Sequence, residues 1–141
     1  MAKTFHLAIS AGDLHNAIYF YCNILGCTKG NSEFKPPDAW CDINFWGNEL
    51  TLHASNCKQT SEQHNVDMGN VLVPHFGVHL EAYEFKGLKE RLIQNDIKFI
   101  DDPYIRFEGE VLEQETMFIK DPSDNIMEFK TMVNPDALFG E

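Results

Sequence analysis

The chain has 141 residues, of which 43% are hydrophobic and 12% aromatic, which argues for a packed core and against disorder. Eleven basic and 22 acidic residues give a formal charge of −11, which argues against nucleic acid or an anionic membrane surface as a partner. This length predicts one domain, or two small modules that share a core.

The first half of the chain predicts a strand, a helix, a loop and two further strands, over residues 4–10, 14–25, 30–38, 40–46 and 49–54. Asp13 suits the N-cap of the helix, and Gly26 suits the position after its last turn. Gly47-Asn48 predicts a tight hairpin turn between the last two strands.

The second half predicts a strand, a helix, a short strand, a loop and two further strands, over residues 75–81, 84–95, 98–100, 101–109, 114–119 and 125–131. Residues 121–124, Asp-Pro-Ser-Asp, predict a turn before the last strand. The polar stretch 55–69 is long for a structureless connection, and we interpret it either as a linker or as a lid over a cleft.

Two segments separated by about half of the chain begin in the same way, His6-Leu7-Ala8-Ile9 and His75-Phe76-Gly77-Val78. Each opens an apolar run that leads into a helical pattern, which indicates an internal repeat. We therefore predict an α+β fold of two βαβββ modules, with a curved, mostly antiparallel sheet around a metal cleft and the helices outside. The chain would be a single domain, 1–141, with module one at about 1–56, a linker at 57–72, module two at about 73–133 and a C-terminal tail.

The repeat brings two histidines into equivalent positions, and a late strand adds a carboxylate. Glu128 lies between Met127 and Phe129, whose side chains point to the opposite face of that strand. A carboxylate in the middle of a strand is costly unless it is paired or bound to a metal. Small residues beside each histidine, Ala8 and Gly77, are expected to leave room for a ligand. We predict that His6, His75 and Glu128 bind one metal ion and leave coordination positions open.

The four cysteines form no C-x-x-C pair, so a cysteine zinc site is unsupported. The N-terminus lacks the pattern of a signal peptide, and no stretch is long and apolar enough to span a bilayer. We therefore expect a cytoplasmic protein with reduced thiols and no membrane partner.

Several motifs occur in a characteristic order: His6-Leu7-Ala8-Ile9, Asp13-Leu14, Phe20-Tyr21, Leu25-Gly26, His75-Phe76-Gly77-Val78, Asp121-Pro122 and Glu128. In this order they resemble the vicinal oxygen chelate superfamily, which includes glyoxalase I, fosfomycin and bleomycin resistance proteins and extradiol dioxygenases. The resemblance covers nearly the whole chain and implies the same three metal ligands. Asp124 departs from the motif, which usually has Gly there, but Asp tolerates a left-handed backbone.

The resemblance implies a metal-dependent enzyme that acts on a small molecule. We favour Fe(II) or Mn(II) and extradiol-type dioxygenase chemistry, with Zn(II) or Ni(II) as alternative metals. Glyoxalase-like isomerisation and thiol addition to an epoxide are alternatives, and so is a non-catalytic protein that binds a drug or a metabolite. Members of the superfamily often dimerise, so a homodimer is expected, with the site formed within one chain or across subunits.

Other residues are candidates for the same site. Glyoxalase-like members place a carboxylate in the strand that here carries Glu49 and His53, and we favour His53 as the site residue, as a ligand, a substrate contact or an acid/base group. Glu49 and His79 are candidates either for an additional ligand or for a residue that contacts a ligand without binding the metal. Substrate contacts are predicted for four residues, Arg106, Phe107, Phe45 and Phe118.

Overall fold

The computed structural model describes residues 3–66 and 69–140. Two compact units make up the fold. Unit 1 consists of Met1–Thr60 and Asp121–Asn125, and unit 2 of Ser61–Lys120 and Ile126–Glu141. Residues 1–2, 67–68 and 141, which belong to the predicted module one, linker and C-terminal tail, lie outside the described residues.

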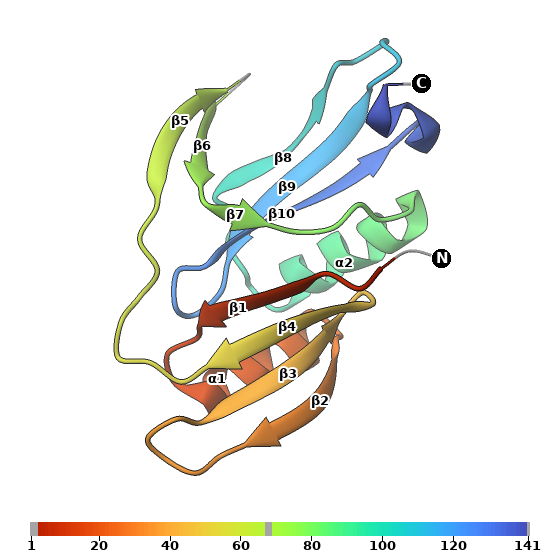
Figure 1. Ribbon diagram of the computed structural model, residues 1–141. Helices are drawn as coiled ribbons and strands as arrows, with labels where there is room; N and C mark the ends of the chain where they lie inside the picture. The colour runs from red at the N-terminus through yellow and green to blue at the C-terminus, as the bar shows by residue number, and fades with distance from the viewer. Residues whose placement is uncertain (1–2, 67–68, 141) are drawn as a thin grey trace. The chain divides into compact units, whose positions relative to one another are not determined.

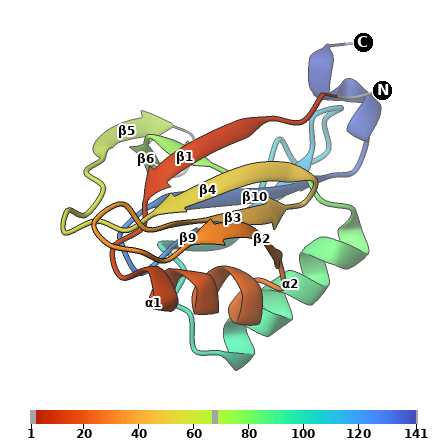
Figure 2. The same ribbon diagram turned by 60° about the horizontal axis from the view of Figure 1, so that its bottom comes forward.

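Unit 1 has one sheet with the strand order β1-β4-β3-β2, in which β1 and β4 are parallel and the other pairs are antiparallel (Figure 1). Its elements are β1 (His6–Ser10), α1 (Leu14–Ile18), the π-helix η1 (Tyr19–Ile24), β2 (Thr28–Glu33), β3 (Trp40–Phe45) and β4 (Asn48–His53). Helix α1 lies against one face of this sheet (Figure 2). The core between helix and sheet includes Tyr21, Ile43, Leu50 and Leu52, each at most 2% exposed.

Unit 2 repeats this arrangement with the order β7-β10-β9-β8, in which β7 and β10 are parallel. Its elements are β5 (Glu62–Val66), β6 (Gly69–Val73), β7 (His75–Phe76), α2 (Ala82–Gln94), β8 (Asp101–Arg106), β9 (Gln114–Lys120), β10 (Ile126–Met132) and the 3-10 helix η2 (Pro135–Phe139). Phe85, Leu88 and Leu92 of α2 are buried, as their helical spacing predicts. The same order of elements in both units confirms the predicted α+β fold of βαβββ modules.

Local capping residues set the helix boundaries. Asp13 caps α1, because its Oδ1 accepts a hydrogen bond from the Asn16 amide at 3.0 Å. Helix α2 starts with a capping box in which Glu81 and Glu84 each satisfy the other's backbone amide, so it begins two residues before the predicted start. Asp124 adopts the left-handed conformation with φ 65°, as expected at this turn.

Two predictions about strands were wrong. Residues 30–38 were expected to form a loop, but β2 covers part of them, and residues 101–109 contain β8 where a loop was expected. Both are edge strands with irregular pairing, and β2 is exposed along nearly its whole length. An edge strand that buries neither face has no alternating apolar pattern to detect, and residues 98–100, the strand predicted instead, form none.

Two further boundaries differ from the prediction. The hairpin turn lies at Trp46-Gly47, one residue earlier than expected, because Phe45 pairs with Asn48. Strand β7 has two residues, although backbone pairing with β10 resumes at His79 and Lys130. The stretch predicted as a linker or lid contains β5, which pairs with β6 in an antiparallel manner, and the polar sequence of β5 had not indicated a strand.

The turn between β9 and β10 belongs to unit 1 through a buried polar network. The Tyr21 hydroxyl donates to Asp121 Oδ2 at 2.8 Å, and Asn125 Nδ2 donates to the Ser10 carbonyl at 2.7 Å. Gly12 in turn lies so close to Ser123 that a Cβ on it would be 2.3 Å from Oγ. The network fixes the residues that precede β10. Among the described residues, no helix has the length and apolar character needed to cross a bilayer.

Candidate metal centre

His75 and Glu128 meet at the start of the parallel β7–β10 pair in unit 2. Nε2 of His75 lies 3.1 Å from Oε1 of Glu128, and the Glu128 side chain is 7% exposed. Nδ1 of His75 lies 2.6 Å from the Leu72 carbonyl oxygen, which requires the proton to be on Nδ1. Nε2 is thereby left as the nitrogen for a metal ion or for a second proton. Ligands at about 2.0–2.2 Å from one ion, on adjacent positions, lie about 3 Å from each other, so the two atoms fit a shared metal.

The pair perturbs the pKa values of both groups. The hydrogen bond with Glu128 raises the pKa of His75, and burial only partly opposes it. Burial by itself raises the pKa of Glu128, but the hydrogen bonds from His75 and Thr116 and the charge of Lys130 outweigh it and lower that pKa. Glu128 is therefore held as a carboxylate in a buried position, which is the state that a metal ligand needs.

Two further side chains that we did not predict contact Glu128. The Thr116 hydroxyl donates a hydrogen bond to Oε2, and Lys130 Nζ lies 3.8 Å from Oε1. Both follow from strand alternation: Lys130 is two residues after Glu128 on β10, and Thr116 pairs with Lys130 on β9. Counting alternate positions outward from Glu128 would have found Lys130. The Leu72 carbonyl has no signal in the sequence, because every residue carries one.

Gly77 has a different role from the one predicted. A Cβ at this position would be 1.6 Å from the backbone carbonyl oxygen of Glu128. Gly77 is therefore needed for the main chain after His75 to lie against β10, rather than to leave room for a ligand. A pocket of about 220 Å³ opens beside it, lined by residues 75–79, Glu128 and Lys130.

His6 in unit 1 contacts a carboxylate through Nδ1, the nitrogen that in His75 contacts the Leu72 carbonyl. Its Nδ1 lies 2.7 Å from Oε1 of Glu49, its partner across the parallel β1–β4 pair. Both side chains are about half exposed, at 57% and 50%. Within each unit, the described residues contain no group of three His, Cys, Asp or Glu side chains placed to hold a metal ion.

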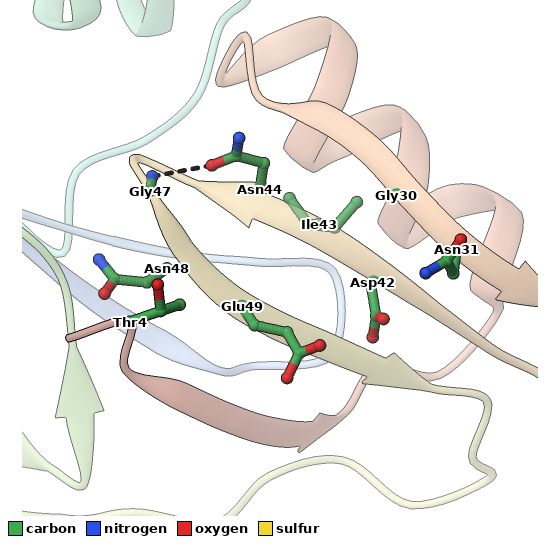
Figure 3. A pocket seen from close by; sticks show the side chains of 9 residues that line it. All are labelled: Thr4, Gly30, Asn31, Asp42, Ile43, Asn44, Gly47, Asn48 and Glu49. Atoms are coloured by element: carbon green, nitrogen blue, oxygen red, sulfur yellow. Dashed lines mark hydrogen bonds between the residues drawn. The ribbon is translucent and has the colours of Figure 1, made fainter.

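Glu49 also lines a polar pocket of about 270 Å³ on the sheet of unit 1 (Figure 3). Asp42 from β3 and Glu49 from β4 point to the same face of this sheet, and Asn44 is held against the turn by a 2.8 Å bond from the Gly47 amide (Figure 3). Asp42 Oδ1 accepts a 2.7 Å hydrogen bond from Thr51. This face is polar, whereas the opposite face of β3 carries buried Cys41, Ile43 and Phe45.

His53 lies on the same face of β4 as Glu49, four residues further along, which corresponds to about 13 Å of strand. It is exposed. Phe45 lies in the core, 3% exposed, with its ring 6.4 Å from that of Tyr21, which favours packing over substrate contact. Phe118 is opposite Glu128 on β9, and its ring meets that of His75 edge-on at 5.4 Å, so it borders the candidate centre.

The remaining predicted residues lie at other places in unit 2. His79 lines the pocket beside Glu128, and burial and the charge of Lys130 lower its pKa. Arg106 ends β8, with its guanidinium 4.9 Å from the ring centroid of Phe107. The structure thus brings His75, Glu128, Phe118 and His79 together in unit 2, and His6 with Glu49 in unit 1.

Comparison with models of protein families found no match, and comparison with curated proteins also found none. Comparison with solved structures found a glyoxalase/bleomycin resistance protein/dioxygenase from Alicyclobacillus acidocaldarius, 34% identical, with a TM-score of 0.76, over 97% of this chain and 96% of that one. The fosfomycin resistance protein FosX from Listeria monocytogenes is 14% identical, with a TM-score of 0.73, over 98% of this chain and 99% of that one.

A variant of the same FosX, complexed with Mn(II) and 1S,2S-dihydroxypropylphosphonic acid, is 12% identical, with a TM-score of 0.67, over 92% of this chain and 91% of that one. At this identity the likeness to FosX concerns the fold. The match to the Alicyclobacillus acidocaldarius protein, by contrast, extends to the sequence over nearly the full length of both chains.

Proposed function

The chain belongs to the glyoxalase/bleomycin resistance protein/dioxygenase family of the vicinal oxygen chelate superfamily, and from this premise we propose that it is a metal-dependent enzyme acting on a small molecule. The proposed metal ligands are His6, His75 and Glu128. One observation carries this proposal: a buried carboxylate lies 3.1 Å from a histidine nitrogen whose ring is oriented by a backbone carbonyl.

The stability of the fold does not by itself explain this buried pair. A buried ion pair contributes little net stability, because removing both charges from water costs about as much as their attraction returns. His75 and Glu128 would hold a metal ion in place of the second proton on His75, and Glu128 would stay ionised. We propose His6 as the third ligand because it occupies in unit 1 the position of His75 and presents the same nitrogen.

A bound Fe(II) or Mn(II) ion supplies Lewis acidity and open positions for adjacent oxygen atoms of a substrate and for O₂. We propose the following roles for the protein's own side chains. Thr116 holds one oxygen of Glu128 and leaves the other for the metal. Phe118, which is buried, packs edge-on against the His75 ring. His53 would accept or donate the substrate proton, and Arg106 with Phe107 would contact an anionic or planar part of the substrate.

We favour extradiol-type dioxygenase chemistry, because two histidines and one carboxylate are the ligand set of non-haem Fe(II) oxygen activation. A second candidate is the opening of an epoxide by water or a thiol. It is supported by the full-length match to FosX, and by the complex of that protein with Mn(II) and a dihydroxypropylphosphonic acid. Glyoxalase-like isomerisation needs a second carboxylate ligand, and the position in unit 1 that corresponds to Glu128 is Thr51, the partner of Ala8.

The experiment is elemental analysis of the protein as purified, beside a His75→Ala variant. We expect a transition metal in the parent protein and its loss in the variant. Metal that survives the substitution would contradict the ligand assignment. Oxygen uptake with catechols, and epoxide opening with water or thiols, then distinguish the two chemistries. Tight binding of a drug or metabolite that persists in a variant lacking all three ligands would instead support a non-catalytic binding protein.

We also propose a homodimer, with the ligands drawn from the two units of one chain or of two chains. Light scattering measures the oligomeric state. Mixing His6→Ala with His75→Ala protein, after subunit exchange, distinguishes the two sources of ligands. Metal binding returns in the mixture if His6 of one subunit completes the His75 and Glu128 pair of another, and it stays absent if each site lies within one chain.

A further inference from the structure

We infer that Glu49 is a positioning residue for the metal: its carboxylate holds Nδ1 of His6 and thereby presents Nε2 as the ligand atom. This inference rests on the proposed function, because it assigns Glu49 a role through a histidine that we propose as a ligand. Glu49 is then neither the fourth metal ligand that the glyoxalase alternative requires nor an ordinary surface residue beside a turn.

The contact between the two side chains is direct. His6 and Glu49 are partners in the register of the parallel β1–β4 pair, and Nδ1 and Oε1 are 2.7 Å apart. A neutral His6 ring that directs an Nδ1–H toward this carboxylate would have its lone pair on Nε2, and this tautomer is the one that we infer. Because both side chains are about half exposed, the pair adds little to folding stability. Stability alone therefore does not account for it.

The second histidine, His75, is also contacted at Nδ1, but by a main-chain carbonyl instead of a carboxylate. In unit 2, the Leu72 carbonyl accepts from Nδ1 of His75, and Nε2 faces Glu128. The two histidines at equivalent points of the repeat are thus both held at Nδ1, one by a carboxylate and one by a main-chain oxygen. Metal-ligating histidines characteristically donate their second N–H to a carboxylate or a carbonyl, which fixes the ring and raises its basicity.

The repeat also separates Glu49 from the position of a carboxylate ligand. In unit 2, Glu128 lies beside Gly77, two residues after His75. The same place in unit 1 is Thr51, beside Ala8, two residues after His6. Glu49 instead lies level with His6 itself, where its carboxylate reaches the imidazole and borders the polar pocket beside Asp42 (Figure 3).

The test measures affinity for Mn(II) alone, from the electron paramagnetic resonance signal of the unbound ion, in Glu49→Ala and Glu49→Gln proteins. Loss of the carboxylate in Glu49→Ala should weaken Mn(II) binding by about 10–100-fold, as is typical for such partners. Glu49→Gln keeps a carbonyl oxygen that accepts from Nδ1–H, so it should recover most of that loss. Glu62→Ala is the matched control, since it removes an exposed carboxylate beside a histidine, His64, at 3.4 Å.

A second readout needs no variant. In metal-free parent protein at about pH 9, where an ordinary imidazole is neutral, ¹⁵N correlation spectra should show the His6 proton on Nδ1. A proton on Nε2 would overturn the inference, and so would a Glu49→Gln protein as weak as Glu49→Ala, because an amide replaces an accepting oxygen but not a carboxylate ligand. If His6→Ala weakens Mn(II) binding and Glu49→Ala does not, the inference fails and the proposed function stands. Unchanged binding in His6→Ala overturns the ligand set and, with it, this inference.

Discussion

The two units share a strand order and a histidine at the start of the first strand, but the surroundings of these histidines differ. In unit 1, His6 contacts an exposed carboxylate, and the position beside Ala8 is a threonine. In unit 2, His75 contacts a buried carboxylate, and the position beside Gly77 is Glu128. The repeat therefore conserves the scaffold and the histidine that we propose as a ligand, whereas the proposed acidic ligand occurs in one copy. This difference predicts unequal effects of matched substitutions in the two units.

The largest effect is expected at the acidic position itself. Glu128→Ala should lower Mn(II) affinity by more than about 100-fold, because it removes a proposed ligand rather than a partner of a ligand. Thr51→Ala, at the equivalent place in unit 1, should change it by only a few-fold. Titration of both variants with Mn(II) measures the contrast. Equal losses would mean that the two positions contribute alike, which would break the proposed asymmetry.

The next largest effect is expected on folding stability, where the backbone at Gly77 lies close to that of Glu128. Gly77→Ala should destabilise unit 2 by about 3 kcal/mol or more, because the new Cβ would lie 1.6 Å from the Glu128 carbonyl oxygen and the strands must separate. Gly87→Ala is the matched control in the same unit. Nothing lies within 4 Å of a Cβ at this position in α2, so alanine should stabilise by about 0.5–1 kcal/mol. Urea unfolding measures both, and a Gly77→Ala protein as stable as the parent would contradict the close approach.

The sequence was sufficient for the features that depend on periodic patterns. Helical spacing located both helices to within about two residues, and the matching His6 and His75 segments revealed the repeat and thus the fold. The alternation of Met127, Glu128 and Phe129 predicted that the carboxylate lies on the face opposite Met127 and Phe129, and both of these residues are fully buried. These features are visible because each apolar side chain in the pattern is buried, and burial is what periodicity records.

The remaining features depend on contacts that leave no such pattern. Edge strands β2 and β8 bury little and pair on one side only, so polar residues are tolerated in them. A glycine is needed at position 77 because a main-chain oxygen of β10, more than fifty residues away in sequence, leaves no room for a Cβ. The partner of His75 Nδ1 is likewise a carbonyl, Leu72, which any residue type would supply. Sequence reasoning located the candidate ligands, but it did not identify the groups that orient them.

An intermediate effect is expected from the buried network of unit 1. Tyr21→Phe should destabilise by about 2 kcal/mol, because Asp121 Oδ2 loses the 2.8 Å hydrogen bond from a hydroxyl in a fully buried position. Burial, reinforced by the neighbouring Asp121 carboxylate, raises the pKa of Tyr21 well above its ordinary value, so the phenol stays protonated over the accessible pH range. Tyr19→Phe, at a 57% exposed position, should change stability by less than about 0.5 kcal/mol. Similar losses of stability in Tyr21→Phe and Tyr19→Phe would contradict a stabilising role of the buried network in unit 1.

The smallest expected effect is a pH dependence confined to unit 2. The hydrogen bond with Glu128 raises the pKa of His75, so this contribution to metal-free stability is complete below the ordinary value of 6.5 and is lost as pH rises through the raised pKa. Glu128 has a lowered pKa, despite burial that raises it, because hydrogen bonds from His75 and Thr116 favour the carboxylate. Its contribution is present above the ordinary value of 4.5 and is lost as pH falls through the lowered pKa.

The stability difference between parent and His75→Gln protein, measured by urea unfolding in a metal chelator, should therefore be greatest between about pH 4.5 and pH 6.5 and should shrink on either side. His64→Gln supplies the matched control, because its histidine faces an exposed carboxylate at 3.4 Å and screening by water leaves such a pair little energy to lose. A difference for His75→Gln that is flat across this range would mean that the ring and Glu128 do not share a proton in the metal-free protein. The buried acid of unit 2 would then be held by Thr116 and Lys130 alone, and the two units would differ only in burial, not in the state of their histidines.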